Sequence, residues 1–155
     1  MRVAFYAPLK PPDSPIPSGD RKMARQLIAC LRSKGYDVKL ISHLKSREPH
    51  GLRHKQIIIK NRSERIVERL SNRFLEVDGW RPDVWFTYHM FYKAPDWLGP
   101  SISKALKIPY VIAEASHAPK RNKGEWSFNQ EQVVLALKHA DVIIGLNSND
   151  ECCVK

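Results

Sequence analysis

Side chains that could bind or transform a ligand gather behind two apolar segments of the chain, 83–88 and 109–113. They are His89, Tyr92 and Lys93 after the first segment, and Glu114, His117, Lys120 and Arg121 after the second. Aromatic rings supply apolar or sugar-stacking walls, while lysine and arginine hold phosphate or carboxylate groups. Histidine donates to substrate hydroxyls or transfers protons, which makes His117 the candidate catalytic residue. A purely structural role is the alternative for His89, as a strand-end cap, and for His117.

The start of the chain carries the pattern of an anion site. Residues 2–7 suit a short buried strand, 8–19 form a proline-rich loop, and an amphipathic helix opens at residue 20. The first N–H groups of a helix are unpaired and its dipole is positive there, so an anion is stabilised. Glycine in addition lets the backbone approach a ligand closely. The candidate anion-binding residues are Ser18, Gly19, Asp20 and Arg21, for which a plain helix cap is the alternative.

The elements that must position these residues alternate along the chain. Hydrophobic periodicity predicts strands at 2–7, 37–42, 83–88, 109–113 and 142–146, and helices at 20–34, at 55–76, from 99 and from 127. Ile57 to Ile59 fits either the start of a helix or a short strand, and Ser127 has capping-box spacing with Gln130. This alternation predicts an α/β fold, a Rossmann-like doubly wound parallel sheet with helices on both faces. Ligands bind such sheets beyond the C-terminal strand ends, where the candidate residues would meet.

Several kinds of site are argued against by what the sequence lacks. No G-x-G-x-x-G follows the first strand and no acidic residue ends the second, so a nicotinamide cofactor is not expected. His50 and His54 have no third ligand nearby, and no metal is expected. The three cysteines, Cys30, Cys152 and Cys153, fit a reducing compartment rather than a disulfide framework. Without a signal-peptide pattern or a long apolar run, the sequence predicts a cytoplasmic protein.

The charge balance favours anionic partners. Lys and Arg total 26 against 16 Asp and Glu, a formal net charge of +10. Such a charge suits phosphorylated substrates, acidic lipid surfaces or nucleic acid. Because no nucleic-acid-binding motif is present, nucleic acid is not the expected partner. We expect instead an anionic small molecule, together with peripheral contact between the basic strand-end loops and the anionic inner face of a membrane.

Several of these segments, in their order and spacing, resemble one family. They are 2–6, 18–21, 34–38, 82–89, 92–100, 108–111, 114–121 and 140–144. Together they are similar to the N-terminal half of GT-B glycosyltransferases, family 4-like, in a bacterial subgroup. The loop Ser18-Gly19-Asp20 departs from the family's usual glycine pair.

The resemblance implies the acceptor-side domain of a retaining glycosyltransferase in polysaccharide biosynthesis. Such an enzyme transfers a sugar from a nucleotide-sugar donor to a glycan or lipid-linked acceptor without a protein-bound metal or other cofactor. Gly19 would then lie near the donor phosphates, and His117 would touch the donor sugar. Residues 1–155 would form the N-terminal domain, inactive alone, and the nucleotide-sugar-binding domain would lie outside the chain. Ser148 and Glu151, spaced to begin a further helix just before Lys155, suggest the first half of a longer protein.

Two alternatives remain open at this point. The first is a non-catalytic Rossmann-like module, such as a truncated remnant, that binds an anionic ligand. The second is a basic nucleic-acid binder, which would show tight and strongly salt-dependent binding to DNA or RNA.

Overall fold

The chain forms one parallel sheet of five strands. The computed structural model describes residues 1–77 and 79–146. The strands are β1 (Arg2–Tyr6), β2 (Asp37–Ser42), β3 (Val84–Met90), β4 (Tyr110–Ala115) and β5 (Val142–Ile144). They lie in the order β2-β1-β3-β4-β5, and every neighbouring pair is parallel. The α/β, doubly wound arrangement predicted from the alternation of elements is therefore confirmed.

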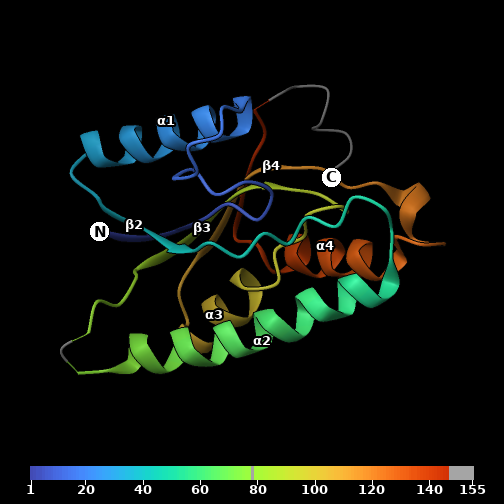
Figure 1. Cartoon of the computed structure of the whole chain (residues 1–155). Coiled ribbons are helices and arrows are strands. Elements are labelled where there is room, and N and C mark those ends of the chain that lie inside the picture. The colour runs from blue at the N-terminus through green and yellow to red at the C-terminus, as the bar shows by residue number, and fades with distance from the viewer. Residues whose placement is uncertain (78, 147–155) are drawn as a thin grey trace.

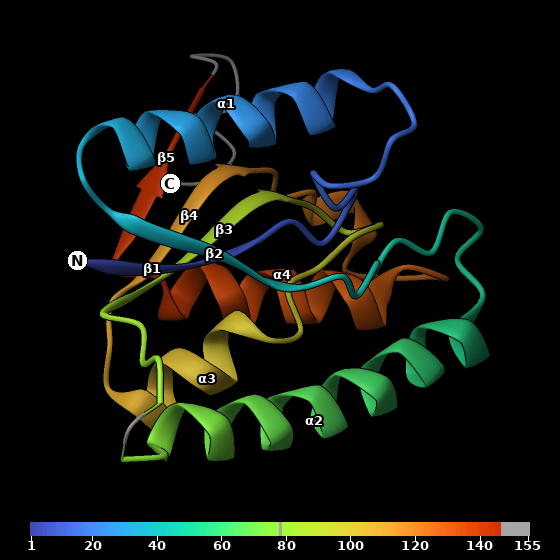
Figure 2. The same ribbon diagram turned by 60° about the vertical axis from the view of Figure 1, so that its left-hand side comes forward.

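Helices cover both faces of the sheet. They are α1 (Gly19–Ser33), α2 (Arg53–Leu75), α3 (Gly99–Leu106) and α4 (Ser127–His139), with a short 3-10 turn, η1 (Pro119–Arg121), before α4. Figures 1 and 2 show α1 alone on one face and the other three helices on the opposite face. The reason is the direction of the crossovers: β1 to β2 runs one way along the sheet and the later connections run the other way. A single handedness then places α1 opposite the rest.

Alternating strand residues build two cores, one on each face. Phe5 and Phe86, neighbours in the β1–β3 ladder, stack with ring centroids 5.4 Å apart on the α1 side. Tyr6 and Trp85 point to the other face and are fully buried beneath α2, α3 and α4. This two-sided burial explains why β1 and β3 are apolar almost without interruption.

The predicted boundaries hold to within a few residues, but one predicted cap is wrong. Strand 37–42 is confirmed as predicted, and Ile57 to Ile59 lies inside α2 rather than in a strand. Ser127 is the first residue of α4 and not its cap; Trp126 occupies the N-cap, and no side chain caps this helix. The predicted capping pair Ser148 and Glu151 lies outside the described residues.

A buried carboxylate fixes the start of α3. The carboxylate of Asp96 accepts hydrogen bonds from the backbone N–H groups of Leu98 and Gly99, both at 2.8 Å. It also accepts from the hydroxyls of Thr87 and Tyr110, and it is completely shielded from solvent. Asp96 thus joins the first turn of α3 to two strands and fixes the loop that leaves β3.

No helix in the described part of the chain is long and apolar enough to cross a membrane.

Candidate functional site

The candidate site lies where the winding of the sheet reverses. The chain leaves β1 toward β2 on one side, and β3, β4 and β5 follow on the other side. The C-terminal ends of β1 and β3 are therefore the switch point, where open α/β sheets bind ligands. The loop 7–18 and the first turn of α1 stand over β1, and the segment after Met90 leaves β3 beside them. The sequence-predicted loops thus converge on one edge of the sheet.

Two adjacent strands carry a left-handed residue at this edge. The backbone angle φ is +59° at His89 and +60° at Glu114, and neither residue is glycine. Tyr88 pairs with Ala113, and Met90 with Ala115, so His89 and Glu114 lie side by side in the β3–β4 ladder. The left-handed conformation costs a non-glycine residue about 1–2 kcal/mol. Two such residues at matched positions mark this strand edge as the site where the fold tolerates strain, as functional sites commonly do.

The left-handed residues also change the face of the sheet to which the last side chains of β3 and β4 point. Tyr88 and Ala113 pack in the core on the α1 side, but Met90 and Ala115, two residues later, pack in the opposite core. In a regular strand, residues two apart share a face. The reversal places the side chains of His89 and Glu114, each partly exposed, between the two cores at the rim of the sheet.

His89 meets a charged group at the start of α1. Its Nδ1 atom lies 3.1 Å from a carboxylate oxygen of Asp20, but no hydrogen bond forms along this contact. The other oxygen of Asp20 accepts from the ammonium group of Lys10 and from the hydroxyl of Ser18. Lys10 also donates to the Ser18 hydroxyl at 3.0 Å. The start of α1 therefore carries a positive and a negative group close together.

The pKa of Asp20 reflects this environment. Partial burial raises it, but the hydrogen bond from Lys10, the nearby His89 and the Ser18 hydroxyl outweigh burial, and the pKa falls below the ordinary value. Tyr88 shows the opposite effect. Burial raises the pKa of its phenol strongly, and the carboxylate of Glu114, its hydrogen-bond partner, raises it further. Asp20 is thus ionised and Tyr88 neutral at physiological pH.

A second group, the aromatic–cation cluster, consists of Tyr92, Lys93, Arg121 and Trp126. The rings of Tyr92 and Trp126 meet edge to face with centroids 5.2 Å apart. The Arg121 guanidinium lies 5.0 Å from the Tyr92 ring centroid, and the Lys93 ammonium lies 5.5 Å from that of Trp126. Ring contacts from His89 through Phe91 to Tyr92 link this cluster to the strand-end residues.

Four of the predicted site residues contain buried nitrogen atoms without a hydrogen-bond partner. These atoms are Nε of Arg21, Nδ1 of His89, Nε2 of His117 and Nε of Arg121. Buried polar atoms are usually paired, so unpaired ones call for an explanation such as a ligand or bound water. Those of His89, His117 and Arg121 lie at or after the C-terminal ends of β3 and β4, so they support a polar ligand site there.

Other predicted residues are placed differently. Arg21 is almost completely buried and donates to the carbonyl of Ile16, so it holds the loop together instead of facing a ligand. Gly19 has no described atom within 4 Å of the position that a Cβ would occupy, so none of the described residues requires glycine there. Lys120 is exposed in η1. Ser18 occupies the N-cap of α1, but its hydroxyl bonds to Lys10 and Asp20 and makes no capping hydrogen bond to the helix backbone.

Lys10, Tyr88 and Trp126 are not among the site residues predicted from the sequence. Lys10 lies in the proline-rich loop, and only the folded loop brings it to Asp20. The partial signal for Tyr88 was its position directly before His89 at a strand end. Trp126 belongs to the site through its contact with Tyr92, which is distant in sequence.

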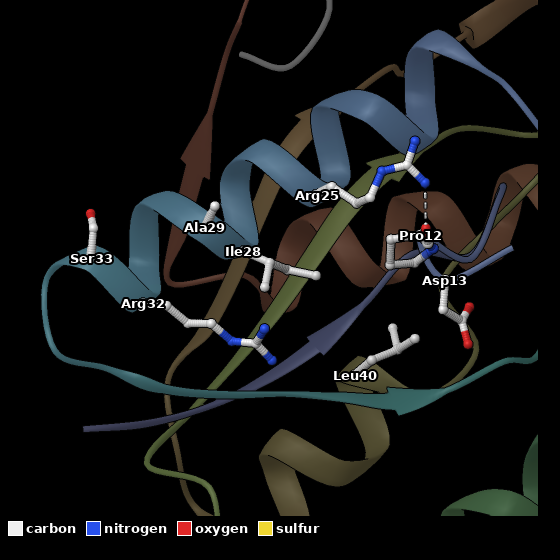
Figure 3. A pocket seen from close by; sticks show the side chains of 8 residues that line it. All are labelled: Pro12, Asp13, Arg25, Ile28, Ala29, Arg32, Ser33 and Leu40. Carbon is white, nitrogen blue, oxygen red and sulfur yellow. Dashed lines mark hydrogen bonds between the residues drawn. The ribbon is translucent and has the colours of Figure 1, made fainter. Parts of the chain in front are cut away.

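A groove of about 690 Å³ lies between α1 and β2, away from these residues. Figure 3 shows its lining, including Arg25, Arg32 and Leu40. Both arginines are engaged with backbone carbonyls: Arg25 donates to Pro12 and Arg32 to Val38, each at 2.8 Å. None of the candidate residues lines this groove, so it is not part of the strand-end site.

Within 1–77 and 79–146, no three histidine, cysteine or acidic side chains converge as a metal site would require. No family model matches the chain. A comparison with curated proteins likewise gives no match. Function is therefore argued from the site itself.

Proposed function

We propose that the chain is the acceptor-side domain of a retaining glycosyltransferase, which transfers a sugar from a nucleotide-sugar to a glycan or lipid-linked acceptor. The observation that carries the proposal is the pair of left-handed residues, His89 and Glu114, side by side at the switch point. The resemblance of the sequence to GT-B glycosyltransferases also favours a ligand site at this edge of the sheet. A non-catalytic module that binds an anionic ligand at the same edge is the alternative.

The strand-end side chains suit a ligand rich in hydroxyl groups. A sugar hydroxyl both donates and accepts hydrogen bonds. Glu114 and Asp20 supply carboxylate acceptors, Lys10 supplies an ammonium donor, and His89 adds the Nδ1 atom of its imidazole, which has no hydrogen-bond partner. A carboxylate so placed can also accept the proton of an attacking acceptor hydroxyl. We assign this role to Glu114, because its partner Tyr88 is neutral, whereas the Asp20 carboxylate is paired with the Lys10 cation.

His117 is proposed to hydrogen-bond the donor sugar. It follows β4 directly, and its Nε2 atom is buried without a partner. A hydrogen bond that strengthens in the transition state lowers kcat when it is removed. The developing charge on the leaving diphosphate would be stabilised by the N-terminal end of α1 and by Lys10.

The experiment that tests the proposal is an amide-resolved NMR titration of the chain. Nucleotide-sugars and oligosaccharides should shift the amide signals of residues 18–20, 89 and 114–117, and inorganic phosphate alone should not reproduce this pattern. His117→Ala should weaken the response while leaving Tm nearly unchanged. A response to phosphate alone, with none to any sugar, would instead support the non-catalytic module.

We propose that α2, in place of the strand-end loops expected from the sequence, makes the contact with an anionic membrane. Four exposed arginines, Arg62, Arg65, Arg69 and Arg73, recur every three or four residues and so form one stripe along the helix. None of them is in an ion pair with a described residue. Exposed Ile58, four residues before Arg62, extends the same helix surface. Basic helices with exposed apolar residues bind anionic lipid surfaces.

A further inference from the structure

We propose that the acceptor carries a negative charge of its own, which is bound by Lys93 and Arg121 of the aromatic–cation cluster. The inference rests on the proposed function, because it names the class of acceptor that the domain would take. Its ligand is a sugar that bears a carboxylate or a phosphate group.

The two cations are held next to one ring. The Arg121 guanidinium and the Lys93 ammonium lie 5.0 and 5.9 Å from the ring centroid of Tyr92. Lys93 is held in addition by Trp126, whose ring is almost fully buried. Cation–π contacts of this kind restrict long side chains that otherwise have many rotamers. The positive charges are therefore positioned before a ligand arrives, which reduces the entropy lost on binding.

No carboxylate neutralises this pair. Among the described residues, neither Lys93 nor Arg121 forms an ion pair with an acidic side chain. The buried carboxylate of Glu48, whose backbone N–H donates to the Lys93 carbonyl, accepts instead from the backbone N–H groups of His50 and Leu52. Two cations that contact the same ring and have no counter-ion among the described residues attract an anion, and the planar guanidinium fork of arginine matches the oxygens of carboxylate and phosphate.

Buried polar atoms without a partner occur in the segments that carry Arg121 and Trp126, and they fit the rest of a sugar. Nε of Arg121 is buried without a partner, and so are both polar atoms of the Asn129 amide. Asn129 is 1% exposed and follows Trp126 by three residues at the start of α4, so both lie on the same side of that helix. An amide offers a donor and an acceptor, which matches the hydroxyl groups of a sugar ring. A simple inorganic anion would leave the amide unpaired.

Binding of four small probes to the chain tests the inference by calorimetry or NMR. The probes are methyl glucoside, glucuronic acid, glucose 6-phosphate and inorganic phosphate. At least one of the two charged sugars should bind about tenfold or more tightly than methyl glucoside and than phosphate, the scale of one charge-assisted hydrogen bond. The better of the two identifies a uronic acid or a sugar phosphate as the source of the charge.

Single-residue variants test whether Lys93 and Arg121 cause the preference for charged sugars. Lys93→Gln and Arg121→Gln should each weaken binding of the charged sugar by about tenfold and leave methyl glucoside unaffected. Arg121→Lys should retain part of the affinity, even if loss of the cation–π contact lowers Tm. Lys123→Gln removes one positive charge from an exposed residue of the same loop and should have little effect. Equal binding of charged and neutral sugars, or an equal loss in Lys123→Gln, would overturn the inference.

The proposed function fails separately. Nucleotide-sugar binding that depends on His89 and Glu114, without any preference for charged sugars, refutes only the anionic acceptor. Charged-sugar binding through Lys93 and Arg121, without any response of residues 89 and 114–117 to nucleotide-sugars or oligosaccharides, refutes the proposed glycosyltransferase and leaves a binding site for charged sugars.

Discussion

Exchanging Glu114 for alanine and for glycine measures the backbone strain at the strand edge. Both variants lose the same carboxylate and the same hydrogen bond to Tyr88, so their difference reports the backbone alone. Alanine keeps the left-handed penalty of about 1–2 kcal/mol. Glycine escapes it but loses about 0.5–1 kcal/mol through its greater freedom in the unfolded chain. Glu114→Gly should therefore be more stable than Glu114→Ala by about 0.5–1 kcal/mol, and the same order should hold at His89.

An ordinary strand position should show the opposite order. Lys39, exposed in β2 and free of left-handed geometry, is a suitable control. There glycine should be less stable than alanine by about 0.5–1 kcal/mol. For a chain of this size, the two sites would then differ by about 2–8 °C in the Tm change from alanine to glycine. Thermal and urea unfolding measure both pairs.

A glycine variant of Lys107 tests backbone strain at a position away from the proposed ligand site. It is the third left-handed non-glycine residue, with φ of +54°, and it ends α3 away from the strand-end side chains. Lys107→Gly should stabilise the chain without any effect on ligand binding, whereas Glu114→Gly should abolish sugar binding. If glycine and alanine rank at 114 as they do at Lys39, the strain argument is wrong.

Three further outcomes follow from the contacts described. Asp96→Ala leaves four buried donors unpaired and should cost about 4 kcal/mol, seen as a fall in Tm of about 8–16 °C, while the exposed Asp83→Ala should change Tm little. Folding lowers the pKa of Asp20, so the ionised carboxylate stabilises the fold fully above its ordinary pKa near 3.8, and this stabilisation is lost as the pH falls below that value. The difference in unfolding free energy between the wild type and Asp20→Asn should therefore vanish at low pH, as urea unfolding at several pH values would show. Replacing the four α2 arginines by glutamine should abolish flotation with anionic liposomes, and equal flotation with neutral liposomes would reject the membrane proposal.

The architecture could be predicted because it follows from local patterns. Apolar strands buried on both faces, amphipathic helices between them and the left-handed Gly35 after α1 each have a sequence signal. Their alternation is sufficient to indicate the sheet, the two helical layers and the edge where ligands bind. The prediction that polar residues after the third and fourth strands belong to one region relied on the same reasoning.

The geometry of the site could not be predicted, because it depends on tertiary contacts. His89 and Glu114 read as ordinary strand-end residues, and only the packing of Met90 and Ala115 in the opposite core forces the left-handed turn. Ser127 has the spacing of a cap, but Trp126, which packs on Tyr92, takes the N-cap position. Arg21 was predicted to bind an anion, but in the fold its guanidinium donates to the loop carbonyl of Ile16.

A crystal structure of the chain with a bound nucleotide-sugar or oligosaccharide tests the central claim most directly. The account predicts the sugar at the C-terminal edge of β3 and β4, with hydroxyl groups within hydrogen-bond distance of Nδ1 of His89 and of the Glu114 carboxylate. A sugar bound instead in the groove between α1 and β2, with the strand-end side chains untouched, would contradict it.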